Sequence, residues 1–171
     1  MHTTQLTTIP ELGRTSPDYV IYVPQGKDER VPDTGNEHFL VFRRKDNTLA
    51  AVWTQSGREG QHIVFAESDV YGKEWSAPRV IAGKNFDPRT GRDMCSWAYP
   101  LVSRSGRIYV LYSKHIGVND TFTHTTGLLT GIYSDDGGRS WSKEAHPAFP
   151  RSEYDHPDPA IPPNCITWQK P

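Results

Sequence analysis

The stretch SDDGGRSW, residues 134–141, follows an apolar run and ends in a tryptophan, an unexpected residue at the end of a polar turn. Serine and aspartate oxygens accept hydrogen bonds from backbone N–H groups that a tight turn leaves unpaired, and glycine supplies the positive φ that such a turn needs. The indole of Trp141 can then be buried against a neighbouring layer. The composition therefore predicts a structural turn that joins two strands.

A second copy of this motif, SDVYGKEW, occupies residues 68–75. Both copies fit the frame S-x-D-x-G-x-x-W, except that the aspartate of the earlier copy stands one place nearer to its serine. The same order of strand, short polar turn, strand, loop and strand precedes each copy, which indicates an internal repeat. We expect a structural role for the motif residues Ser68, Asp69, Gly72, Trp75, Ser134, Asp136, Gly138 and Trp141.

Short runs rich in Val, Ile, Tyr, Phe and Trp recur along the chain, and Gly, Pro, Asn and Asp separate them, as is typical of strands. No window shows the 3.6-residue apolar period of a helix with its caps. The sequence therefore predicts an all-β chain, with strands near 19–24, 38–44, 49–55, 62–68, 79–83, 98–104, 107–114, 127–134 and 165–170.

The 171 residues carry a formal net charge of −1, which gives no indication of a nucleic-acid or anionic-membrane partner. Cys95 and Cys165 form no C-x-x-C pair, and no run is long enough to span a membrane. We expect no metal site and no cofactor. The amino terminus lacks the pattern of a signal peptide, so the protein is either cytoplasmic, or secreted or periplasmic with its leader missing from this chain.

The two motifs resemble the Asp-box, or BNR, repeat of the sialidase-like superfamily, whose members are six- or seven-bladed β-propellers with four-stranded blades. The resemblance covers about residues 19–171. It implies the amino-terminal portion of one propeller domain, an open fragment of about two and a half blades, with the remaining blades as partners. Blade one would span about 38–83 and blade two about 98–148; a third would begin at about 165–171, and 19–24 would be the strand that closes the ring.

Connections in such a blade alternate between two sides of the wheel. The short turns 45–47 and 104–106 should share one side with both motifs. The long segments should gather on the other side, where functional residues tend to lie over a rigid scaffold. Those segments are 56–61, 84–97, 115–126 and 151–164.

The residue types in and beside the long segments suit a glycan or acidic polysaccharide. Cationic side chains pair with carboxylates or sulfates, aromatic rings pack on sugar rings, and histidines transfer protons near neutral pH. The predicted substrate-binding residues are Arg58, His62, Arg92, Trp97, Lys114, Asn119 and Arg151. The predicted catalytic residues are His38, His115, Asp120, His124 and Tyr154.

Three functions stay open: a sialidase-like glycoside hydrolase, which we favour, a polysaccharide lyase that uses His, Tyr and Arg, and a non-catalytic carbohydrate-binding propeller. The resemblance implies that a sialidase has its first arginine in an Arg-Ile-Pro motif on the first inner strand. Here that strand begins Glu37-His38-Phe39, and the blade-one loop, 56–61, offers Glu59 where the family has its aspartic acid/base. These two departures argue against strict exo-sialidase activity.

Overall fold

The computed structural model describes residues 20–23, 35–56, 62–87, 89–118, 127–153 and 155–165. Every regular element in these ranges is a β-strand, as the sequence predicts. A helix with the length and apolarity needed to cross a membrane does not occur in this part of the chain.

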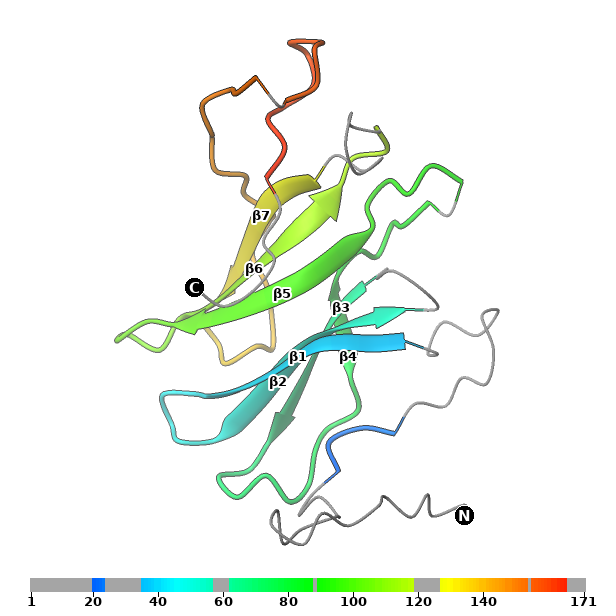
Figure 1. Cartoon of the computed structure of the whole chain (residues 1–171). Helices are drawn as coiled ribbons and strands as arrows, with labels where there is room; N and C mark the ends of the chain where they lie inside the picture. Colours follow the sequence, from blue (N-terminus) through cyan, green and yellow to red (C-terminus); the bar gives the residue numbers. More distant parts are fainter. Residues whose placement is uncertain are drawn as a thin grey trace, which may run out of the picture.

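Two antiparallel sheets make up the fold (Figure 1). The first sheet runs in the order β1 (Gly35–Arg43), β2 (Leu49–Ser56), β3 (His62–Ser68) and β4 (Arg79–Ala82). The second runs in the order β5 (Cys95–Val102), β6 (Ile108–His115) and β7 (Gly127–Ser134). Each of these seven strands was predicted from its apolar run.

The fourth strand expected in the second sheet is reduced, in the described residues, to one isolated bridge between Gly131 and Ala145. Pro147 and Pro150 follow that bridge closely. Because proline has no backbone N–H, it cannot continue a hydrogen-bonded ladder. The sequence therefore ends the pairing almost as soon as it begins.

The main core lies between the two sheets. Val52 of β2 and Phe65 of β3 are fully buried and pack in one cluster with Val110 and Tyr112 of β6. Strand β5 contacts β1, β2 and β3, so it joins the second sheet to the first. Each fully buried Val or Phe side chain contributes about 1.5–3 kcal/mol, which makes this contact the principal source of stability.

A smaller cluster covers the opposite face of the first sheet. Ala51 and Trp53 are fully buried there, because Ile21, Tyr22 and Trp75 pack against the cluster to which they belong. The ring of Tyr22 lies 5.7 Å from that of Trp53. Strand β2 is thus buried on both faces, which explains its nearly continuous apolar run, LAAVW. Residues 20–23 form no strand, and the ring-closing role of 19–24 remains a prediction.

The face of the second sheet that points away from the first sheet is open. Ile108, Val110 and Tyr112 point into the main core, so the alternate residues of β6 point outward. Leu101, Tyr109 and Tyr133 lie in register across three strands and are 43%, 36% and 38% exposed.

Candidate functional site

Strand direction divides the molecule into two sides. The turn side carries the hairpin turns 44–48 and 103–107 and both turn motifs. The loop side carries the ends of β2, β4 and β6. This is the division expected from the sequence, because consecutive antiparallel strands connect at alternate ends.

Each sheet begins with a strand that is bulged near the loop side. The register shifts after Glu37 in β1 and after Ser96 in β5. The residues in the bulges, His38 and Trp97, have positive φ values of 52° and 59°. A left-handed backbone costs a non-glycine residue about 1–3 kcal/mol, and bulges redirect side chains. The same irregularity at the same place in both sheets marks the loop side as the candidate site.

The bulges bring His38 and Trp97 together. Their ring centroids lie 5.9 Å apart at an interplanar angle of 79°, an edge-to-face contact. The backbone N–H of Trp97 donates to Oγ1 of Thr54, at 3.0 Å, and the Thr54 side chain is almost completely buried. Nδ1 of His38 lies 3.8 Å from a carboxylate oxygen of Glu37. The pair therefore combines a flat apolar surface with a polar imidazole.

His62 stands at the loop-side end of β3. Its Nδ1 lies 2.8 Å from the carbonyl oxygen of Gly83, and its ring meets that of Phe86 edge to face at 6.4 Å. A carbonyl oxygen only accepts hydrogen bonds, so Nδ1 of His62 must carry the proton. The ring is partly exposed.

His115, at the end of β6, is 6% exposed. Its backbone N–H donates to the carbonyl of Met94 at 2.8 Å, and its carbonyl accepts the N–H of Asp93 at 2.9 Å. The N–H of Gly117 donates to Nδ1 at 3.1 Å. Nε2 is buried and has no hydrogen-bond partner among the residues that the structure describes.

Lys114 lies in a polar network beside the main core. Its Nζ lies 3.0 Å from Asp93 and 2.5 Å from Glu144, which also accepts a hydrogen bond from Tyr112 at 2.9 Å. Burial acts to lower the pKa of Lys114, but the hydrogen bonds to Glu144 and Asp93 outweigh it and raise the pKa. A hollow of about 190 Å³ adjoins this network. The predicted substrate cation thus already has two carboxylate partners.

Arg92 and Arg151 of the predicted substrate-binding set lie within the described ranges, and they differ in their partners. The guanidinium of Arg151 donates to the carbonyls of His156 and Ile161 and ties the loop of residues 151–165 to itself. Arg92 is exposed and makes no ion pair with another described residue, so its charge is accessible to a ligand. The remaining predicted site residues lie outside the described ranges: Arg58, Asn119, Asp120, His124 and Tyr154.

The first turn motif has the hydrogen bonds that its composition predicts. Asp69 Oδ1 accepts the N–H groups of Tyr71 at 3.0 Å and Gly72 at 2.8 Å, so the aspartate still closes the turn from its earlier position. The hydroxyl of Ser68 donates to the carbonyl of Glu74. The indole of Trp75 donates to the carbonyl of Gly72 at 2.9 Å.

The second turn motif is closed in a related way. The N–H of Gly138 donates to the hydroxyl of Ser134 at 2.8 Å. One oxygen of Asp136 accepts the N–H of Ser140 at 2.9 Å and the other accepts its hydroxyl at 2.6 Å. Trp141 packs on the main core, whereas Trp75 packs on the opposite face of the first sheet.

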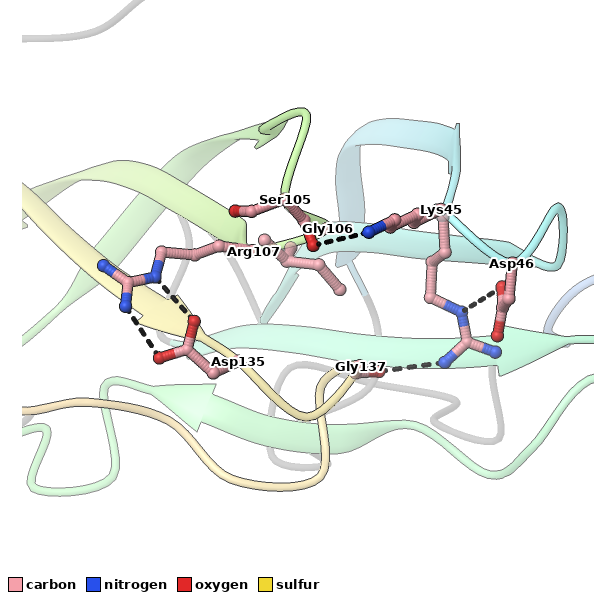
Figure 2. Close-up of a pocket in the computed structure, with 9 residues that line it drawn as sticks. Lys45, Asp46, Ser105, Gly106, Arg107, Asp135 and Gly137 are labelled. Carbon is pink, nitrogen blue, oxygen red and sulfur yellow. Dashed lines mark hydrogen bonds and ion pairs between the residues drawn. The ribbon is translucent and has the colours of Figure 1, made fainter.

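A hollow of about 520 Å³ lies on the turn side, between the two hairpin turns and the second motif (Figure 2). Lys45 reaches across it and donates to the carbonyl of Ser105 at 3.2 Å. Its lining consists of Arg44, Lys45, Asp46, Ser105, Gly106, Arg107, Ile108, Asp135 and Gly137.

The arginines around this hollow are already paired. Arg107 makes two hydrogen bonds to Asp135, at 2.6 and 2.8 Å. Arg44 bonds to Glu67 at 2.6 Å and to the carbonyl of Gly137 at 2.9 Å, and so links the first sheet to the second motif. Of the contacts around the hollow, Arg44 to Gly137 and Lys45 to Ser105 fasten the two sheets together. The hollow is larger than the loop-side hollow beside Lys114, but its chemistry is that of a structural clamp.

Sequence reasoning overlooked Thr54, Gly83 and Phe86, which hold Trp97 and His62 in place. Thr54 gave the one usable signal, a polar residue at the end of the apolar run LAAVW. Gly83 contributes only a backbone carbonyl, which any residue could supply. Within the described ranges, no three His, Cys, Asp or Glu side chains gather closely enough to hold a metal ion.

No protein-family model and no curated protein matches this chain. Among solved structures it is similar to the "Hadza microbial sialidase Hz136", at 17% identity and a TM-score of 0.54, over 65% of this chain and 25% of that one. It is also similar to a protein of unknown function from Dyadobacter fermentans DSM 18053, at 17% identity and a TM-score of 0.55, over 77% and 41% of the two chains. The chain thus spans less than half of either protein, and the similarity supports a sialidase-like fold.

Proposed function

We propose that this chain is part of a sialidase-like β-propeller that binds a glycan on its loop side and acts as a glycoside hydrolase. The contact between His38 and Trp97 carries the proposal, because two strained backbones hold a flat ring and an imidazole together at the loop side. An indole packs well against the C–H face of a sugar, and an imidazole exchanges hydrogen bonds with hydroxyls and carboxylates.

Three features support a propeller. The turn motif recurs after 66 residues, from Ser68 to Ser134. Two sheets pack face to face. Trp141 packs between them, on the face of the second sheet that meets the first, and Trp75 packs on the opposite face of the first sheet, as in a repeating stack. The outward row of Leu101, Tyr109 and Tyr133 is apolar and would be covered by a further blade.

The charge of Arg92 would favour an acidic glycan over a neutral one as the ligand of the loop side.

Binding of defined sugars to this chain tests the site directly. The probes are 3′-sialyllactose, a glucuronate oligosaccharide and lactose. Titration calorimetry measures the affinity of the protein for each of them. We expect Trp97→Ala to weaken binding by about 5- to 12-fold, because loss of one aromatic contact costs about 1–1.5 kcal/mol. Trp97→Phe should retain most of the affinity.

Tyr71→Ala is the matched control, because Tyr71 is 70% exposed at the tip of the first motif, on the turn side. Its affinity should equal that of the wild type. Equal loss in both variants, or binding that is unchanged in Trp97→Ala, would remove the loop side as the sugar site.

A polysaccharide lyase is the second candidate. It is favoured by His38, an imidazole on the bulged strand where the resemblance implies the first arginine of a sialidase. The full-length gene product, incubated with a sialylated glycan and with a uronate polysaccharide, separates the two activities. Free sialic acid supports the hydrolase, whereas the ultraviolet absorbance of an unsaturated uronate supports the lyase. Binding without either product leaves the carbohydrate-binding propeller.

A further inference from the structure

The backbone fixes His62 and His115 in opposite tautomers. The acceptor at His62 Nδ1 is the carbonyl of Gly83, so Nδ1 is protonated and the neutral ring has its lone pair on Nε2. The group at His115 Nδ1 is the N–H of Gly117, which only donates. The lone pair of His115 is therefore on Nδ1 and already used, and its proton is on Nε2.

Exposure follows the same division. The His62 ring is partly exposed, and Nε2 bonds to no other residue in the described part of the chain. His115 is 6% exposed, and neither of its nitrogens has a free lone pair in the neutral form. Of these two rings, only His62 can take a proton from a ligand without first breaking a bond to the backbone.

The surroundings of His115 are those of a packing element. A Cβ on Gly91 would lie 2.9 Å from Nδ1 of His115. Gly91 belongs to residues 83–94, the link between β4 and β5, so this link packs directly against the ring. Gly91 and Gly117 have φ values of 74° and 80°, which glycine adopts without strain. The imidazole thus fixes the end of the link 83–94, while His62 stands at its start.

We propose that His62 is the proton-accepting group of the loop side and that His115 is a neutral ring that positions the link 83–94. The proposal rests on the proposed hydrolase function. Nε2 of His62 takes a proton from a water molecule, and the water oxygen attacks the anomeric carbon. The glycosidic bond breaks, its electron pair stays on the leaving oxygen, and that oxygen takes a proton from solvent. The carbonyl of Gly83 keeps the ring oriented throughout.

Nitrogen NMR of the full-length gene product, labelled with ¹⁵N-histidine, reads the tautomers without any substrate. We expect the two-bond correlations of His62 to show Nδ1–H and those of His115 to show Nε2–H, with each signal assigned by its loss in the His→Asn variant. An Nε2–H tautomer at His62 would overturn the proposal. Because this measurement needs no turnover, it tests the proposal even if none of the tested glycans is cleaved.

Kinetics on the cleaved glycan then separates a chemical role from a structural one. His62→Asn keeps a side-chain N–H for the Gly83 carbonyl but has no basic nitrogen, so kcat should fall about 100-fold or more with KM within about 3-fold. Tyr71→Ala, a change at an exposed residue on the turn side, should retain kcat within about 3-fold.

His62→Gln is the second variant at this position, in case His62→Asn does not fold. It should show the same loss of kcat with an unchanged melting temperature. Wild-type turnover in a folded His62 variant, or a loss in Tyr71→Ala as large as that in His62→Asn, would contradict the proposal.

Discussion

Trp141, in the second turn motif, lies edge to face against Phe65 in the middle of β3, with ring centroids 5.5 Å apart. Trp141 follows β7 of the second sheet, whereas Phe65 lies in the first sheet and is completely buried. Gly138 completes the contact, because its α-carbon lies where a side chain would collide with the Phe65 ring. The turn motif therefore does more than close a hairpin: it packs one sheet on the next.

Replacing Trp141 with alanine should lower the free energy of unfolding by about 3 kcal/mol, because a large ring is removed from the core between the sheets. Urea denaturation followed by circular dichroism measures the loss. Tyr71→Ala, which removes an aromatic ring from an exposed position, should change stability by less than about 0.5 kcal/mol. A Trp141→Ala variant as stable as the wild type would show that the indole does not pack between the sheets.

Gly138 and Gly137 provide a matched pair for separating steric overlap from backbone strain. Both have positive φ, 98° and 76°. A Cβ at Gly138 would lie 2.4 Å from Phe65, whereas one at Gly137 would lie 3.5 Å from the flexible side chain of Arg44. Gly137→Ala should cost about 1 kcal/mol for the strained φ alone. Gly138→Ala should cost at least about 2 kcal/mol more, since the core must also shift. Thermal melts of the two variants should therefore differ clearly.

Asp136 should give the protein a carboxylate-dependent stability. Hydrogen bonds from the side chain and backbone of Ser140, and then from Ser134, hold the pKa of Asp136 well below its ordinary value of 3.8. The stabilisation is complete above the unfolded pKa and decreases as the pH falls below about 4, because the unfolded chain then binds the proton more readily.

Melting temperatures measured from pH 7 to pH 2 test this effect. Asp136→Asn should be less stable than the wild type at pH 7, and the difference should shrink as the solution becomes acidic. Glu153→Gln, a change at an exposed carboxylate, is the control and should follow the wild-type curve. A constant gap between Asp136→Asn and the wild type would contradict the role of this carboxylate.

The two cysteines should differ sharply in reactivity. Burial raises the pKa of Cys95 to about 12, with Lys114 opposing the shift and Glu144 adding to it, and the side chain is 0% exposed. Cys165 is partly exposed, and burial raises its pKa as well. Because the thiolate is the reactive form, DTNB should label Cys165 slowly and Cys95 only after denaturation. Rapid labelling of two thiols in the native protein would contradict the burial of Cys95.

Much of the fold could be predicted from the sequence because strands and turns are specified by neighbouring residues. LAAVWTQ and HIVFAES predicted β2 and β3 closely, and both turn motifs close through their own serines and aspartates. The reduced fourth strand of the second sheet was not predicted. Its prolines were visible, but whether one bridge or a full ladder forms depends on contacts with β7.

The candidate site could be predicted only as a set of residue types. Sequence placed His62, Lys114 and Arg151 among the sugar-binding residues and His115 among the catalytic ones, since charge and side-chain chemistry were all that could be compared. The structure distinguishes them by their partners. Lys114 is paired with two carboxylates, Arg151 with backbone carbonyls of its own loop, and the two imidazoles with backbone groups of opposite polarity.

By itself, the sequence determined an all-β chain with a repeated turn, because alternation of side chains and turn chemistry act over a few residues. Only the tertiary structure decided that His38 meets Trp97 and that His62 differs from His115. Those outcomes depend on bulges, on cross-strand register and on the packing of one sheet against another. Such contacts join residues that are distant in the chain, so no local pattern specifies them.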